Sequence, residues 1–130
     1  MESLLAHKII PVLTVNDPDV ASNAVAALQM GGIECIEIAL RTENALAVLE
    51  SLCLRFPELM IGAGTLRRPE EFNRVTSAGA QFAVSPGSTA EMLQESTRWD
   101  IPYLPAAATV SEILNIANLG FSAVKIFPAE

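Results

Sequence analysis

The stretch IIPVLTVNDPDVASNAVAALQMGGIECIEIAL, residues 9–40, holds two apolar runs with a helix-like segment between them. The runs, residues 9–15 and 35–40, contain the β-branched residues that are typical of strands. Between them, Asp17 can cap a helix, the proline after it suits the first turn, and a pair of glycines can end it. The inward stripe of this helix is expected to comprise Val20, Ala24, Ala27 and Leu28. The stretch therefore predicts a strand, a helix and a second strand.

The same unit repeats along the chain, with six strand-like runs whose starts are 20–26 residues apart. The runs are IIPVLTV (9–15), CIEIAL (35–40), MIGAGT (60–65), FAVSP (82–86), YLPAAA (103–108) and AVKIFP (123–128). Helical segments separate them, and two of these begin with a possible capping box, Ser88 with Glu91 and Thr109 with Glu112. Strict alternation predicts one α/β domain, residues 1–130, in which helices connect the strands of a parallel sheet.

Two architectures fit this alternation. One is an open, doubly wound sheet, and the other is a (β/α)8 TIM barrel, whose active site lies at the carboxyl ends of the strands. The GAG at residues 62–64 lacks the third spaced glycine of a dinucleotide-binding turn, so it is a weak signal for the first architecture.

Composition excludes several classes of function. The chain has a net charge of −7, and its lysines and arginines are scattered, which disfavours a nucleic acid or an anionic membrane as partner. No apolar stretch approaches the ~20 residues of a membrane helix, and no signal peptide is evident, so we expect a cytoplasmic protein. Cys35 and Cys53 lie in apolar runs without a metal-binding pattern, so we expect reduced thiols and no metal.

Two ionisable residues interrupt strands that helices should cover, Glu37 in CIEIAL and Lys125 in AVKIFP. Burying a charge is costly unless it is paired. For either residue alone, a solvated strand end or a plain ion pair is an equally good explanation. Together, near strand ends where barrels carry out chemistry, they favour a functional site.

Lysine and glutamate in a barrel interior suggest a particular chemistry. Burial disfavours the charged form of an amine and increases the fraction that can attack a ketone and form an imine. The protonated imine stabilises a carbanion on the adjacent carbon, and a carboxylate can move the protons. The pair therefore suggests cleavage or formation of a carbon–carbon bond next to a carbonyl.

Other polar residues have simpler explanations. The planar fork of Arg41 suits a carboxylate or phosphate, but from spacing alone a solvated arginine or a partner for Glu43 explains it better. Thr65 at the end of GAGT can cap the next helix or bind a ligand.

These segments resemble the 2-keto-3-deoxy-6-phosphogluconate (KDPG/KHG) aldolases. The resemblance covers the whole chain and rests on EIALRTE, GAGT, AVSPG, TVSE and KIFPAE, in the order and spacing of the family. It implies a (β/α)8 barrel and a class I Schiff-base lyase, without metal or cofactor, that cleaves KDPG to pyruvate and glyceraldehyde 3-phosphate. A trimer is the oligomer that the resemblance favours, and the partner is a small-molecule substrate.

The resemblance also implies roles for six residues. Lys125 forms the imine with pyruvate, and Glu37 is the general acid and base. Arg41 binds the carboxylate derived from pyruvate. The other substrate-binding residues are Thr65, Pro86 and Phe127.

The chain departs from the family in two places. Ala106 stands where the family usually has glycine, and only six of eight strand units are present. We therefore expect a C-terminally incomplete barrel without the phosphate-binding turns after strands seven and eight. Such a chain could form the imine and still turn over the phosphorylated substrate weakly.

Two further hypotheses remain open from the sequence. One is a non-catalytic half-barrel that acts as an assembly or interaction module. The other is a different barrel enzyme that uses Lys125 only as a charge for binding phosphate. Cleavage of 4-hydroxy-2-oxoglutarate (KHG) as a second activity is also open.

Overall fold

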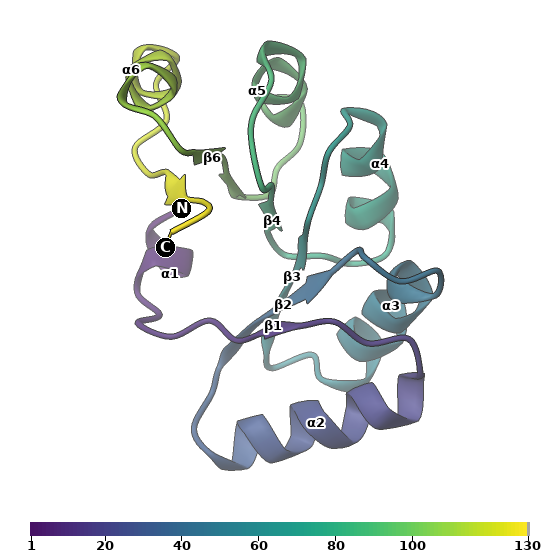
Figure 1. Ribbon diagram of the computed structural model, residues 1–130. Helices are drawn as coiled ribbons and strands as arrows, with labels where there is room; N and C mark the ends of the chain where they lie inside the picture. Colours follow the sequence, from purple (N-terminus) through teal and green to yellow (C-terminus); the bar gives the residue numbers. More distant parts are fainter. Residues whose placement is uncertain (130) are drawn as a thin grey trace.

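The computed structural model describes residues 1–129 and shows a curved parallel sheet with all but the first helix along its outer side (Figure 1). The strands are β1 (Val12–Leu13), β2 (Cys35–Ala39), β3 (Met60–Gly64), β4 (Ala83–Val84), β5 (Tyr103–Leu104), β6 (Ala106–Ala107) and β7 (Lys125–Ile126). The helices are α1 (Glu2–Leu5), α2 (Pro18–Met30), α3 (Ala45–Arg55), α4 (Glu70–Ser77), α5 (Ala90–Ser96) and α6 (Val110–Asn118).

The strand order decides between the two predicted architectures. The first five strands pair in parallel in the order β1-β2-β3-β4-β5, and β6 pairs in parallel with β7. A doubly wound sheet needs a point at which the strand order reverses. Among residues 1–129 the order is consecutive, as in a (β/α) barrel, so the doubly wound alternative is wrong.

One predicted strand is divided in two. The run at residues 103–108 forms β5 and β6, which belong to different sheets, and Pro105 lies between them. Proline has no backbone N–H to donate to a strand ladder. The single strand expected over this run is therefore wrong.

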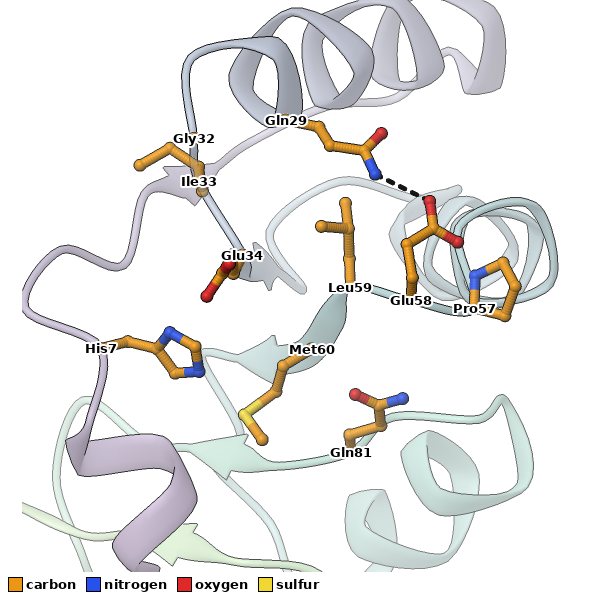
Figure 2. A pocket seen from close by; sticks show the side chains of 10 residues that line it. All are labelled: His7, Gln29, Gly32, Ile33, Glu34, Pro57, Glu58, Leu59, Met60 and Gln81. Carbon is orange, nitrogen blue, oxygen red and sulfur yellow. Dashed lines mark hydrogen bonds between the residues drawn. The ribbon is translucent and has the colours of Figure 1, made fainter.

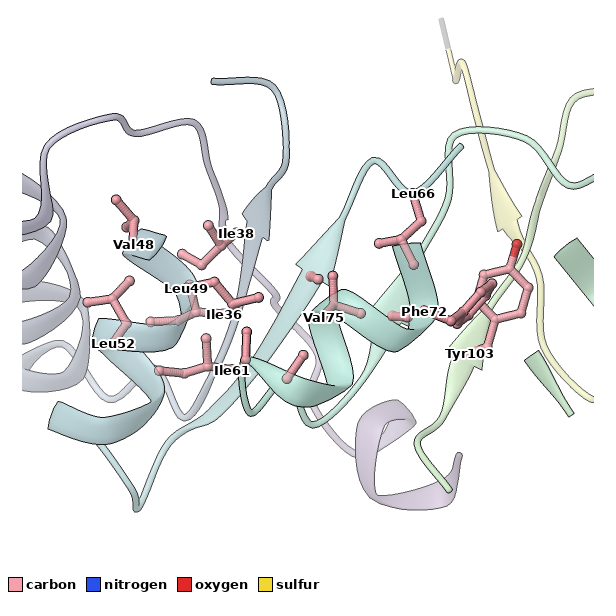
Figure 3. Packing of buried hydrophobic residues seen from close by; sticks show 14 of the residues in the cluster. Ile36, Ile38, Val48, Leu49, Leu52, Ile61, Leu66, Phe72, Val75 and Tyr103 are labelled. Atoms are coloured by element: carbon pink, nitrogen blue, oxygen red, sulfur yellow. The ribbon is translucent and has the colours of Figure 1, made fainter. Parts of the chain in front are cut away.

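Side chains alternate between the two faces of the sheet. The outer face packs on the helices in a large cluster that includes Ile36, Ile38 and Phe72 (Figure 3). The inner face carries a smaller cluster, Leu4, Cys35, Phe82 and Val84, in which Leu4 comes from α1. Glu37 therefore lies on the inner face, two residues beyond Cys35 on β2.

The N-termini of α5 and α6 can be compared with the two capping boxes that the sequence predicted. Thr109 and Glu112 form the capping box of α6, as predicted. The box predicted for Ser88 and Glu91 is wrong, because the cap of α5 is Thr89, whose Oγ1 accepts a hydrogen bond from the amide of Met92.

The predicted inward stripe of the first helix is also wrong in part. Val20 is 59% exposed, and α2 buries Ala21, Ser22 and Val25 instead. Ala24 and Leu28 are half-buried, whereas Ala27 is exposed.

Both cysteines are free thiols, as expected. Burial raises the pKa of Cys35 to about 11, with a smaller contribution from the nearby charge of Glu37, and burial also raises the pKa of Cys53 to about 11. Both sulfurs are therefore protonated and poorly reactive at neutral pH. Among residues 1–129, no helix is long and apolar enough to cross a membrane.

Candidate active site

The two ionisable residues that the sequence singled out meet at the carboxyl end of the sheet. Lys125 Nζ, from β7, lies 3.6 Å from Glu37 Oε2, from β2. The side chain of Glu37 is 6% exposed and that of Lys125 is 28% exposed. The carboxylate is thus enclosed, while the amine is open to a ligand from solvent.

The surroundings of Glu37 favour its protonated form. Burial raises the pKa of Glu37 above the ordinary value, although the nearby positive charges of Lys125 and Arg41 oppose this rise. A raised pKa brings a carboxyl group closer to the pH at which an enzyme works, and this helps it both to accept and to return a proton. Its position next to an amine is therefore suited to acid–base chemistry.

The glycines of β3 make room for this arrangement. A Cβ at position 64 would collide with the carboxylate of Glu37, and a Cβ at position 62 would collide with the ring of Phe82. Glycine inside a strand often marks such a close approach. The sequence showed the two glycines but did not identify the side chains that need the space.

Phe127 follows Lys125 on the same segment and lies beside it. Lys125 Nζ is 5.5 Å from the centroid of the Phe127 ring, and the Phe127 residue is 36% exposed. This is within the range of a cation–π contact. The ring thus forms one wall beside the amine.

The other three predicted site residues lie at the same end of the sheet, each following a different strand. Arg41 follows β2 and is exposed, Thr65 directly follows β3, and Pro86 follows β4 and is half-buried. Thr65 has a φ of 67°, in the left-handed region that a β-branched residue rarely adopts. Within residues 1–129, direct contacts join Lys125 to Glu37 and Phe127, whereas Arg41 makes no ion pair.

Sequence reasoning missed a group of hydroxyls near this edge. Ser85, Ser88 and Tyr103 contact one another, and the sequence analysis had assigned Ser88 to a helix cap. The signal was weak, because a serine after a turn usually caps a helix.

An open hollow lies at the opposite end of the strands. Figure 2 shows this open groove of about 650 Å³, where Glu34 precedes β2 and Met60 begins β3. His7 lines it, and Gln29 donates a hydrogen bond of 2.7 Å to Glu58. Residues 1–129 contain no group of three His, Cys, Asp or Glu side chains that could hold a metal ion. Neither Glu37 nor Lys125 lines this groove.

Comparison with known proteins gives the family of this chain. The family model described as KDPG and KHG aldolase matches residues 1–130. The chain belongs to this family. The fold class expected from the sequence is confirmed by a solved KDPG aldolase from Legionella pneumophila, which has a TM-score of 0.90 and 42% identity over 92% of this chain. That protein holds pyruvate captured at low pH as a covalent carbinolamine intermediate.

Two curated relatives of the family support the assignment. The 2-dehydro-3-deoxy-phosphogluconate aldolase of Dickeya dadantii is 39% identical over 98% of this chain and 60% of its own length. The KHG/KDPG aldolase of Escherichia coli K12 is 39% identical over 99% of this chain and 61% of its own length. The chain thus spans about 60% of the length of these relatives.

Proposed function

We propose that this chain carries the catalytic pair of a class I aldolase that cleaves 2-dehydro-3-deoxy-6-phosphogluconate to pyruvate and glyceraldehyde 3-phosphate. The observation that carries the proposal is the 3.6 Å approach of Lys125 Nζ to the buried Glu37 carboxylate. Two relatives that share this chain's fold or sequence are named as aldolases for this compound.

The first steps belong to Lys125. Its free amine attacks the C2 carbonyl of the keto acid and forms a carbinolamine. Loss of water then leaves a protonated imine, which withdraws electrons from the neighbouring C3. The captured pyruvate of the Legionella pneumophila aldolase is an intermediate of this type.

The proton transfers belong to Glu37. As a carboxylate it accepts the proton of the C4 hydroxyl while the C3–C4 bond breaks, and the bonding electrons move into the imine to give an enamine. Glyceraldehyde 3-phosphate leaves. Glu37 then returns the proton to C3, and water hydrolyses the imine and releases pyruvate. A raised pKa suits a group that must both accept and donate.

The remaining site residues bind the substrate in this proposal. Arg41 pairs with the carboxylate of the keto acid, since a guanidinium fork matches two carboxylate oxygens. Thr65, Pro86 and Phe127 surround the reacting carbons. Their common position beyond the carboxyl ends of the strands supports these roles.

Several broader features are part of the same proposal. Residues 1–130 act as one domain, the protein is cytoplasmic and forms a homotrimer, and the reaction serves carbohydrate breakdown by the Entner–Doudoroff pathway. 4-Hydroxy-2-oxoglutarate is a second substrate, which the name of the Escherichia coli relative supports. Light scattering after size exclusion tests the trimer.

Chemical trapping tests the central step. The protein is incubated with pyruvate and sodium borohydride, which reduces an imine to a stable amine, and the adduct is located by intact mass and peptide mapping. The chain has two lysines, so the exposed Lys8 is an internal control. We expect one adduct on Lys125, none on Lys8, and none in the Lys125→Arg variant.

The result of the trapping experiment also distinguishes an aldolase from a non-catalytic module. A folded sample without an adduct on Lys125 would refute the aldolase proposal and favour the non-catalytic module. An adduct formed equally on Lys8 would show unselective amine chemistry and would equally contradict a built site.

A further inference from the structure

Three hydroxyl groups form a compact cluster beside the proposed active site. Tyr103 OH lies 2.6 Å from Ser85 Oγ and 3.1 Å from Ser88 Oγ, and the two serine oxygens are 3.1 Å apart. Ser85 is 1% exposed and Tyr103 is 4% exposed. Burial raises the pKa of Tyr103 above its ordinary value, so the phenol keeps its proton and remains a donor at neutral pH.

The cluster joins three segments that lie side by side in the fold. Ser85 follows β4, Ser88 precedes the cap of α5, and Tyr103 belongs to β5. Ser88 Oγ also accepts a hydrogen bond of 2.9 Å from the backbone N–H of Ala106. Ala106 begins β6 directly after the break at Pro105, so Ser88 satisfies a backbone donor where the sheet is interrupted.

This backbone donor is next to the reactive lysine. Ala106 and Lys125 are register partners in the β6–β7 pair, and the N–H of Lys125 donates to the carbonyl of Pro105 at 2.8 Å. The β6–β7 pair is separate from the five-stranded sheet that carries Glu37. The Ala106 N–H donates to Ser88 Oγ, which in turn contacts Tyr103 OH on β5. These bonds therefore tie the strand pair that holds the amine to the sheet that holds the carboxylate, in addition to the covalent connection through Pro105.

The Tyr103 ring is held in place independently of its hydroxyl. It packs edge-to-face on Phe72, with ring centroids 5.0 Å apart, and on Phe121 at 6.1 Å (Figure 3 shows Phe72 and Tyr103). Such contacts fix the direction of the ring. The phenol oxygen is thus held at a fixed position, where it orients the hydroxyl groups of Ser85 and Ser88.

We propose that Ser88 and Tyr103 are positioning residues, which hold the β6–β7 pair so that Lys125 faces Glu37 at the distance that imine chemistry needs. Neither residue touches the substrate in this role. They act through Ala106 and the strand pairing. The inference rests on the proposed function, because it concerns how fast Lys125 reacts with a keto acid.

Pyruvate trapping by borohydride tests the positioning role of Ser88 and Tyr103. The trapping rate is measured at a series of pyruvate concentrations. Tyr103→Phe removes only the phenol oxygen, and Ser88→Ala removes the acceptor of the Ala106 N–H. In each variant we expect a maximal trapping rate about five-fold lower, as the loss of one hydrogen bond implies. The pyruvate concentration at half-maximal rate should stay unchanged, since the contacts to pyruvate remain.

Two matched variants separate positioning from stability. Ser96→Ala removes another buried serine hydroxyl, that of the last residue of α5, which donates to the carbonyl of Leu93 at 2.8 Å. It should lower the melting temperature and leave the trapping rate unchanged. Ser88→Thr keeps the hydroxyl, and Ser88 borders a hollow of about 360 Å³ that gives the added methyl room, so the rate should be retained.

Amide hydrogen exchange gives a readout that does not depend on catalysis. In Ser88→Ala, the amide of Ala106 should exchange faster than in the parent, while amides of β2 remain protected.

The inference is overturned if Tyr103→Phe and Ser88→Ala trap pyruvate at the parent rate, or if Ser88→Ala leaves exchange at Ala106 unchanged. It is also overturned if Ser96→Ala slows trapping as much as Tyr103→Phe and Ser88→Ala do, because the lower trapping rate would then reflect lower stability alone. A parent protein that forms no adduct would refute the proposed function itself. The two failures are therefore distinguishable.

Discussion

Gly64 leaves open the space that the carboxylate of Glu37 occupies, because a Cβ at position 64 would collide with that group. The two residues are on adjacent strands, where Gly64 pairs with Ala39 and Glu37 pairs with Gly62. A glycine in β3 is thus part of the geometry of an acid–base group in β2.

Gly64→Ala tests this dependence. The methyl must displace the carboxylate or distort the strand, so we expect the free energy of unfolding to fall by about 1–3 kcal/mol, together with a slower reaction of Lys125 with pyruvate. Urea denaturation and borohydride trapping measure the two effects. Gly87→Ala is the control for stability, since a Cβ there meets nothing within 4 Å. Equal stability in the two variants would show that the site tolerates the methyl.

The raised pKa of Glu37 predicts a pH dependence of stability. A group whose folded pKa lies above its unfolded value stabilises the protein below the unfolded value, about 4.3, and this contribution is lost as pH rises through the folded pKa. Glu37→Gln removes the titration. We therefore expect the free energy of unfolding of the variant, relative to the parent, to increase from pH 4 towards neutral pH. Urea titrations of both proteins measure this difference in the free energy of unfolding. A difference that does not change with pH would contradict the raised pKa of Glu37.

Lys125→Met should raise the pKa of Glu37 further. The nearby charge of Lys125 lowers the pKa of Glu37, so its removal should raise that pKa. Carbon-detected NMR titration of the Glu37 carboxyl measures the change. The exposed Lys8→Met variant should leave the titration of Glu37 as it was.

The left-handed backbone of Thr65 predicts a conflict between stability and function. A non-glycine residue in this region costs about 1–3 kcal/mol, and Thr65 has a φ of 67°. Thr65→Gly should relieve this cost and increase the free energy of unfolding by roughly 1 kcal/mol, while it removes a hydroxyl from the proposed substrate pocket and slows trapping. Thr65→Ala keeps the strain and loses the hydroxyl, so it should slow trapping without the gain in stability.

Replacement of Thr76 by valine should stabilise the protein. Its Oγ1 is buried and has no hydrogen-bond partner among residues 1–129. An unsatisfied buried polar group costs about 1–3 kcal/mol, and valine has nearly the same shape and helix propensity as threonine. Thr76→Val should therefore increase the free energy of unfolding by about 1 kcal/mol, as measured by urea denaturation. Thr76→Ser, which keeps the hydroxyl, should show no such gain.

Much of this arrangement could be predicted from the sequence because it depends on local pattern. The run at residues 35–40 became β2 with Glu37 on the inner face, since a strand covered by helices reads as a continuous apolar run. The approach of Lys125 to Glu37 followed from parallel strands ending at one edge. The pairing of charges across strands is thus accessible to sequence reasoning when both stand out against apolar neighbours.

Other features depend on contacts that local pattern does not encode. In α2 the alanine-rich sequence left the inward face ambiguous, and Val25 is buried where Val20 was expected. The short helix α1 was not anticipated, because four residues carry too little periodicity. Two partners of Ser88, Tyr103 and Ala106, lie 15 and 18 residues away along the chain, and only the fold brings them together.

The division of the sheet at Pro105 has a consequence for local unfolding. Five register pairs hold β2 to β3, whereas two hold β6 to β7. Segments with few backbone hydrogen bonds open at lower free energy than the whole molecule. We therefore expect the β6–β7 pair, which carries Lys125, to open at a lower free energy than the β2–β3 pair, which carries Glu37, so that the amine can move away from the carboxylate before the whole molecule unfolds.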